Sequence, residues 1–143
     1  MTVRAILLAK GTDVITTRPD ASVDEVVRVL GRRGVGAVVV QATDGSVLGV
    51  LSERDVIAAM TQHGVSAMSL PAYEVMHEPV TCTSEDSLPY VMSLMTSRRT
   101  RHLPVVEGGR LRGLVSIGDV VKHRLEEAEQ ETSVLREYII YAG

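Results

Sequence analysis

The sequence predicts an α+β fold in which two βαββα units pack as a pseudo-twofold pair, followed by a long C-terminal helix. One observation is a repeat: the segment GVLSERD at residues 49–55 returns as GLVSIGD at 113–119. Each copy is typical of an apolar strand that runs directly into a helix. The other is that a three-stranded sheet with helices on one side leaves its second face bare. Two copies must therefore share a core.

The composition limits both the core and the class of function. The chain has 143 residues, of which 45% are hydrophobic, but it has neither Phe nor Trp, so the core must be aliphatic. The net charge of −3 argues against a nucleic-acid-binding face, which would be basic. Cys82 is the only cysteine, so an internal disulfide is excluded. No apolar run approaches the roughly 20 residues of a membrane span.

The first half contains a complete set of helix and strand signals. Residues 3–9 predict a short helix and residues 14–17 a strand, which Pro19 ends. Ser22 and Glu25 predict a capping box, and the helix that follows has an apolar stripe at helical spacing. Residues 37–40 predict a buried strand, Asp44-Gly45 a hairpin turn and residues 47–51 the return strand. Ser52 then opens a second helix. Its expected apolar face is Val56, Ile57 and Met60.

The same order returns in the second half. After a connector at 61–72, residues 73–76 predict a helical turn and residues 79–82 a short strand. Ser87 caps a helix whose first turn tolerates Pro89. Residues 102–106 and 111–115 predict two strands joined at Gly108-Gly109. The last helix begins at Ile117 and is expected to continue to Ile139. Its apolar residues Val120, Val121 and Leu125 are interpreted as core or dimer contacts.

These signals divide the chain into two units. Residues 1–64 form the first unit with its N-terminal helix, 65–72 the linker, and 73–143 the second unit with a C-terminal helical extension. In each unit the middle helix connects neighbouring strands, so that pair should be parallel with a right-handed crossover.

At this point the residues resemble a known family. The doubled Gly-x-x-Ser-x-x-Asp signature, the order of elements and the segment RHLPV at 101–105 are similar to tandem cystathionine β-synthase (CBS) domains, also called a Bateman module. The similarity covers about residues 3 to 125, and the chain resembles the small stand-alone bacterial members. It implies a cleft between the repeats with up to two sites for AMP, ADP, ATP, S-adenosylmethionine or NAD(H), and no catalytic cofactor.

The resemblance also implies roles for particular residues. Asp55 and Asp119 would accept hydrogen bonds from ribose hydroxyls, and Ser52 and Ser116 would donate to phosphate. A helix N-terminus favours an anion, and a carboxylate suits a vicinal diol. Arg101 would contact phosphate, and because Gly36 replaces it in the first half, the two sites should differ; the site without Arg101 would rely on Arg54, Lys10 and backbone. The remaining expected ligand contacts are Val14, Ile15, Met76, Val80, His102, Pro104 and Ile117.

Each of these residues also has a simpler interpretation. Ser52 with Asp55, and Ser116 with Asp119, are plain capping boxes as well. Arg101 and Arg54 could be solvated surface charges. Arg98 and Arg99 are explained by a helix C-terminus, which favours cations. The four histidines lack metal-ligand spacing, so no metal site is expected. Cys82 is interpreted as a small core residue.

The predicted function is a non-enzymatic regulatory module, such as an energy sensor, that binds an adenine nucleotide and signals through a conformational change in a homodimer. The alternative is a protein-interaction scaffold with vestigial nucleotide sites. An enzyme is not expected. The tail beyond Leu125 is the part expected to pack on another chain. The N-terminal ten residues are too short for a signal peptide, so the protein is predicted to be cytoplasmic, with an unknown protein partner and neither nucleic acid nor membrane.

Overall fold

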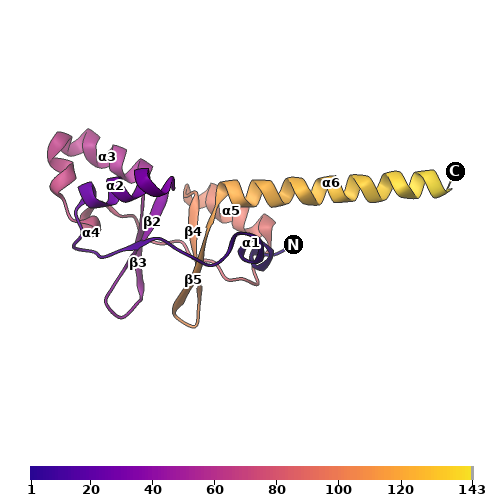
Figure 1. Cartoon of the computed structure of the whole chain (residues 1–143), viewed down its shortest axis with the longest axis horizontal. Helices are drawn as coiled ribbons and strands as arrows, with labels where there is room; N and C mark the ends of the chain where they lie inside the picture. The colour runs from indigo at the N-terminus through magenta and orange to yellow at the C-terminus, as the bar shows by residue number, and fades with distance from the viewer. Residues whose placement is uncertain (143) are drawn as a thin grey trace.

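The computed structural model describes residues 1–142 and confirms the α+β class (Figure 1). Helices and strands alternate through two similar halves, and a single long helix ends the chain. The elements in order are α1 (Val3–Lys10), β1 (Thr16–Thr17), α2 (Val23–Arg33), β2 (Ala37–Gln41), β3 (Val47–Ser52), α3 (Glu53–His63), the 3-10 helix η1 (Gly64–Ser69), α4 (Ala72–Val75), α5 (Leu88–Arg98), β4 (His102–Glu107), β5 (Arg110–Ser116) and α6 (Ile117–Ala142).

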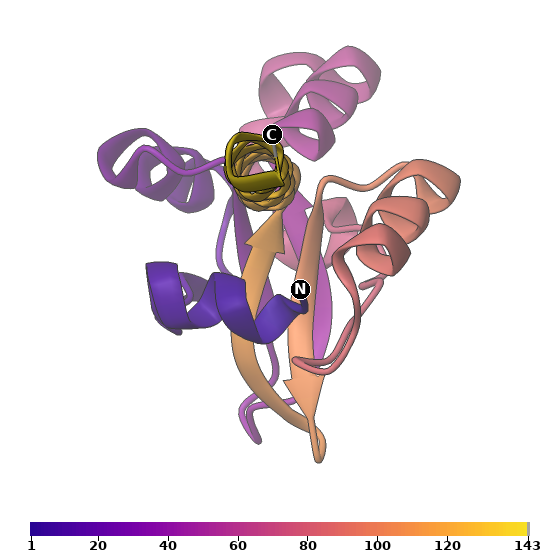
Figure 2. The same cartoon turned by 90° about the vertical axis from the view of Figure 1, so that its right-hand side faces the viewer.

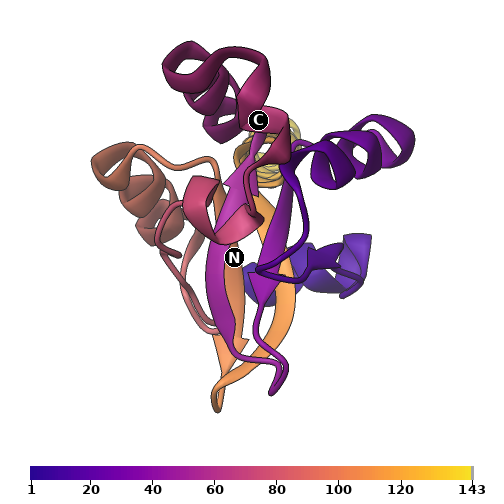
Figure 3. The same cartoon turned by 90° about the vertical axis from the view of Figure 1, so that its left-hand side faces the viewer.

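Two small sheets form the centre of the molecule. In the first, β1 pairs parallel with β2, and β2 pairs antiparallel with β3. In the second, β4 and β5 form an antiparallel hairpin. Views from the two ends show one sheet lying directly behind the other (Figures 2 and 3). The predicted parallel pairing and both predicted hairpins are confirmed.

The strand predicted over 79–82 is wrong in its extent. It shrinks to one parallel bridge between Cys82 and Val105, in which the Cys82 amide donates to the Pro104 carbonyl at 3.0 Å. Proline has no amide hydrogen, so Pro79 cannot extend the ladder towards the N-terminus. The strand predicted over 14–17 is also shortened, to Thr16–Thr17, although the Ile15 carbonyl still accepts from Val39.

Serine side chains cap the helices as predicted, with one difference. The hydroxyl of Ser22 accepts from the Glu25 amide at 3.2 Å, and that of Ser87 accepts from Tyr90 at 3.2 Å. The predicted box at Ser22 is only half formed, because the Glu25 carboxylate turns towards Arg18, 3.8 Å away. A surface ion pair with Arg18 has replaced the second bond of the box, from the Ser22 amide to the Glu25 carboxylate.

The two hydrophobic cores exchange helices between the halves. The first contains residues of α2, β2, β3 and α3 together with Ala72 of α4. The second contains residues of α5, β4, β5 and α6 together with Val3, Ile6 and Leu7 of α1. Helix α1, which the sequence groups with the first unit, therefore packs on the second sheet. The boundaries at 65–72 stay a prediction.

Two signature glycines allow this exchange. A β-carbon on Gly113 would lie 2.6 Å from Cδ2 of Leu7 in α1. A β-carbon on Gly49 would lie 2.8 Å from the carbonyl oxygen of His77, just after α4. At both positions the sheet accepts a segment from the other half only because no side chain is present.

The predicted apolar face of α3 differs from the structure. In α3 the buried residues are Val56 and Ala59, whereas Ile57 is 66% and Met60 43% exposed. The predicted connector is also more ordered than expected: α3 runs to His63, and η1 follows and packs against α3. In α6 Val120 is fully buried, but Val121 and Leu125 are exposed.

Candidate functional site

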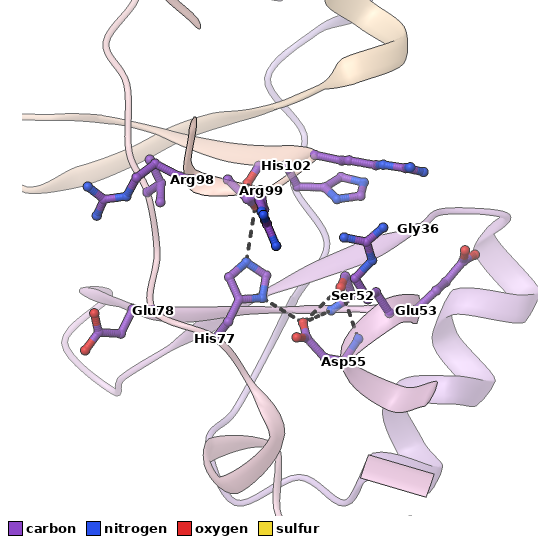
Figure 4. Close-up of a pocket in the computed structure, with 13 residues that line it drawn as sticks. Gly36, Ser52, Glu53, Asp55, His77, Glu78, Arg98, Arg99 and His102 are labelled. Atoms are coloured by element: carbon purple, nitrogen blue, oxygen red, sulfur yellow. Dashed lines mark hydrogen bonds and ion pairs between the residues drawn. The ribbon is translucent and has the colours of Figure 1, made fainter. Parts of the chain in front are cut away.

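A hollow of about 420 Å³ lies between the two halves, at the start of α3. Its walls come from the β3–α3 junction of the first half and from the segments before β4 in the second (Figure 4). The residues that line it are Gly36, Ser52, Glu53, Arg54, Asp55, His77, Glu78, Val80, Arg98, Arg99, Thr100, Arg101 and His102. Seven of the predicted site residues are therefore brought together here.

Ser52 and Asp55 form a reciprocal capping box at the floor of the hollow. The Asp55 amide points to the Ser52 hydroxyl at 3.4 Å, and the Ser52 amide donates to Oδ2 of Asp55 at 2.8 Å. The Ser52 hydroxyl also donates to that oxygen, at 2.9 Å. The capping interpretation is thus confirmed. The amides of Glu53 and Asp55 are already bonded, to the Gly36 carbonyl and to Ser52, so the preference of this helix start for an anion comes from the helix dipole.

His77 is the main residue that the sequence analysis missed. Its Nδ1 lies 2.7 Å from Oδ2 of Asp55, and its Nε2 lies 3.3 Å from the hydroxyl of Thr100 (Figure 4). The ring therefore links the start of α3 to the segment before β4. These contacts cross 22 and 23 residues of chain, so no local pattern predicts them.

The second signature forms the same serine–aspartate capping box, but Lys10 takes the place that His77 has at the first. The Ser116 amide and hydroxyl donate to Oδ2 of Asp119 at 2.9 and 3.0 Å, and Lys10 donates to the same oxygen at 2.8 Å. Lys10 ends α1 and His77 follows α4, so each exchanged helix delivers a basic side chain to the carboxylate of the other half. One carboxylate faces an imidazole and the other a lysine side chain.

These contacts keep both carboxylates ionised. Burial favours the neutral acid at Asp55, but the hydrogen bonds from His77 and Ser52 outweigh it and lower the pKa. At Asp119 burial is likewise outweighed, by Lys10 and Ser116, and the pKa is lowered. Burial, followed by the charge of His77, lowers the pKa of His102. A negative acceptor and a neutral imidazole therefore share this region at neutral pH.

Arginine side chains give the hollow its cationic character. Arg54 comes from α3, and Arg98, Arg99 and Arg101 come from the end of α5 and the approach to β4. Arg99 adopts a left-handed backbone with φ of 52°. A helix C-terminus is enough to explain Arg98 and Arg99 in the sequence, and no motif there places them in this hollow. Anions should be attracted here despite Glu53 and Glu78.

The predicted division of basic residues between two sites is wrong. Arg101 was expected in one site, with Arg54 and Lys10 in the other. Arg54 and Arg101 line the same hollow, while Lys10 bonds Asp119. Gly36 and Arg101 do hold equivalent positions, since their carbonyls accept from Glu53 and Ile117 at the two helix starts. Arg101, which belongs to the second half, therefore lines the hollow beside Ser52 and Asp55 of the first half.

The other predicted contacts lie outside the lining of this hollow. Ile15 and Met76 pack against the first core, and Ile117 against the second. Pro104 is buried in β4, with its carbonyl bonded to Cys82. Val14 is half-buried just before β1. Only Val80, of the apolar residues predicted to contact adenine, lines the hollow.

The chain Thr100–His77–Asp55 has the order of a nucleophile, base and acid. The hydroxyl of Thr100 also donates to the His102 carbonyl at 3.3 Å, and the residue is only 7% exposed. A catalytic hydroxyl must reach its substrate, and this one is held in the wall. The three residues therefore brace the junction between the halves.

Comparison with known proteins decides the family. The profile of the CBS domain matches twice, at residues 3–62 and 72–126. The chain belongs to the CBS domain family. The two matches make it a tandem CBS pair, in agreement with the resemblance noted in the sequence. The junctions at Ser52 and Ser116 are the strand-to-helix junctions of the two CBS repeats.

Solved CBS proteins share the fold. A CBS-domain-containing protein of Agrobacterium tumefaciens is 41% identical, with a TM-score of 0.83 over 86% of this chain and 92% of that one. A CBS domain protein of Pyrobaculum aerophilum, solved in complex with AMP, is 27% identical, with a TM-score of 0.74 over 83% of this chain and 89% of that one. A mitochondrial CBS domain-containing protein of Arabidopsis thaliana is 34% identical over 84% of this chain and 61% of its own length.

The CBS pair is shorter than the first curated relatives it matches, spanning 61%, 35% and 57% of their lengths. Within residues 1–142, none of the helices combines the length and the apolar character needed to cross a bilayer. Over the same residues, histidine, cysteine and acidic side chains do not gather in threes as a metal site would need.

Proposed function

We propose that this CBS pair is a non-enzymatic regulatory module of the cytoplasm that binds an adenosine-containing ligand, AMP, ATP or NAD(H), in the hollow between its repeats. The observation that carries the proposal is the meeting of an ionised Asp55, the positive end of the α3 dipole and several arginines around one hollow. The AMP complex of the Pyrobaculum relative supports the choice of an adenosine ligand.

In the proposed mode, the ribose hydroxyls donate to Asp55. Ser52 and His77 both bond Oδ2 of that carboxylate, so we assign the diol to Oδ1. Hydrogen bonds to an ionised acceptor contribute roughly 1.5–3 kcal/mol each. The phosphate then lies at the start of α3, within reach of Arg101 and Arg54, and the base packs against Val80. The diol is thus held by an anionic acceptor, and the phosphate by cationic donors.

A second ligand is proposed at the start of α6. Asp119 and Ser116 would take the ribose and phosphate there, with Lys10 beside them and Val14, Ile15, Pro104 and Ile117 as the remaining candidate contacts. Met76 and His102 stay candidates for the first site, because Met76 lies beside His77 and His102 lines the hollow. Because Lys10 already pairs with Oδ2 of Asp119, the charge of this ionised carboxylate is compensated before a ligand arrives. We expect this second site to bind nucleotides more weakly than the first.

A ligand can shift only an equilibrium whose states it binds unequally. The hollow takes its walls from both repeats, so a bound nucleotide favours the relative placement of repeats that closes on it. We propose that a homodimer passes this change to an unidentified protein partner. The second candidate is a scaffold in which the signature serves only as helix caps, which the bonds at Ser52 and Ser116 favour.

Thermal unfolding with and without nucleotide separates these two functions. A ligand at a hundred times its Kd stabilises the fold by about 2.7 kcal/mol, or roughly 8 °C for a domain of this size. AMP, ATP and NADH at millimolar concentration should raise Tm by this order for at least one ligand. Unchanged melting with all three would favour the scaffold.

Arg101→Ala should discriminate between ligands. Loss of a charged hydrogen bond to phosphate should weaken AMP about 30-fold, whereas adenosine, which lacks the phosphate, should bind as before. Isothermal calorimetry measures both. Arg110→Ala is the matched control, since Arg110 is an exposed arginine at the start of β5, outside the lining of the hollow. Equal losses for AMP and adenosine would contradict a phosphate contact.

A further inference from the structure

We propose that α6 pairs with α6 of a second copy as a parallel, in-register, two-stranded coiled coil. This goes beyond the nucleotide site, because it names the surface, the orientation and the register of a contact that needs no ligand. It rests on three features of α6: an exposed apolar face, a heptad spacing and a matching set of charges.

Helix α6 packs on the body only through its first turns. Val120 is fully buried, His123 is 7% exposed, and Glu127 accepts from the N-terminal ammonium of Met1 at 3.2 Å. Beyond these residues the helix continues away from the sheets and the other helices (Figure 1). The side chains of Leu125 and Leu135 are each 60% exposed. A long apolar face at this exposure requires a partner.

The apolar and small residues on that face follow a heptad repeat. Their spacing alternates between three and four residues over three heptads, as in a two-stranded coiled coil. The a positions are Gly118, Leu125, Thr132 and Ile139, and the d positions are Val121, Ala128 and Leu135. An amphipathic helix that only covers a globular core follows 3.6 residues per turn and drifts from this register.

The flanking charges choose the partner and its direction. In a parallel pair each g residue faces the next e residue of the other helix. Glu131 at g therefore faces Arg136 of the partner subunit. Arg124 at g, which bonds Glu127 of its own helix at 2.7 Å, faces Glu129 of the partner subunit. Both contacts are attractive, and symmetry repeats each of them. The helix is thus complementary to a second copy of itself.

The antiparallel arrangement is disfavoured by the same residues. In an antiparallel pair centred between Ala128 and Thr132, Glu129 would face its own copy and Lys122 would face Arg136 of the partner subunit. Like charges at these flanking positions are destabilising. A parallel pair puts the two CBS bodies at the same end of the coil.

Disulfide trapping tests the pairing in the whole chain. Leu125→Cys places a thiol at an a position, next to its own copy in the parallel pair. In the antiparallel pair described above, the two thiols would lie about 15 Å apart along the axis. Cys82 is buried and its pKa is raised to about 12, so it does not compete. Leu125→Cys should cross-link about tenfold faster than the adjacent control Glu126→Cys, on the outer b position.

Charge exchange tests the register. Glu131→Arg sets two arginines against each other across the pair and should slow the cross-linking of Leu125→Cys severalfold. Adding Arg136→Glu should restore the rate. The two residues are five positions apart, on different sides of one helix, so restoration reports a contact between chains. Equal cross-linking at 125 and 126, or no recovery in the double exchange, would overturn the proposal. AMP calorimetry on the same variants should be unchanged, which separates this result from the nucleotide site.

Discussion

Asp55→Ala should reduce AMP affinity at the first site by about 100-fold or more, because two hydrogen bonds to an ionised acceptor are lost together. The variant also removes the return bond of the capping box, from the Ser52 amide. A lost cap costs about 1 kcal/mol, so the domain should still fold. Isothermal calorimetry gives the affinity, and thermal unfolding checks the fold.

Asp44→Ala is the matched control for this experiment. Asp44 is an exposed carboxylate in the β2–β3 hairpin that bonds Ser46, outside the lining of the hollow. It should leave AMP binding unchanged. Asp119→Ala should remove only the weaker second site. If Asp55→Ala binds AMP as tightly as the unmodified chain, the ribose assignment is wrong.

Gly49→Ala should lower the free energy of unfolding by about 3 kcal/mol, in the range of overpacked positions. The added carbon would lie 2.8 Å from a backbone oxygen, that of His77, and 2.6 Å from Sδ of Met76. The His77 segment is tied to β3 by two backbone bonds with Val50, at 3.0 and 3.1 Å. The methyl group can be accommodated only by moving that segment. Denaturant unfolding measures the loss.

Gly113→Ala is the paired comparison, because it tests the equivalent residue of the second signature. Its β-carbon would meet the end of the Leu7 side chain at 2.6 Å, and a side chain can rotate where a backbone cannot. The loss there should be about 1 kcal/mol. Because His77 holds Asp55, Gly49→Ala should also weaken AMP. Equal stability of the two variants would contradict the argument from close backbone approach.

The local elements of this fold are predictable from sequence. Serine caps, hairpin glycines and the repeat at 49–55 and 113–119 are short-range signals, and the structure places a strand-to-helix junction at both copies. The exchange of α1 and α4 between the cores was not predictable from such signals. It depends on which sheet has room beside Gly49 or Gly113, and that is a property of the assembled pair. The exposure of Ile57 was not predictable for the same reason: which face of α3 is buried depends on the segments that pack against it in the assembled pair.

The candidate site divides in the same way. The signature residues Ser52 and Asp55, and the basic segment at Arg101, are visible as motifs and lie together. His77 and Thr100 belong to no motif, and they enter the site through the packing of one half on the other. The pairing of Lys10 with Asp119 likewise follows from the placement of α1. The sequence pattern identifies the serine and the aspartate at each helix start. It does not identify the basic side chain, His77 or Lys10, that the other half brings to the aspartate.

A crystal structure of the chain grown with AMP would show where the nucleotide binds. We expect the ribose hydroxyls on the Asp55 carboxylate and the phosphate at the first turn of α3, beside Arg101. Nucleotide bound away from both helix starts, or an empty hollow at millimolar AMP, would contradict this placement.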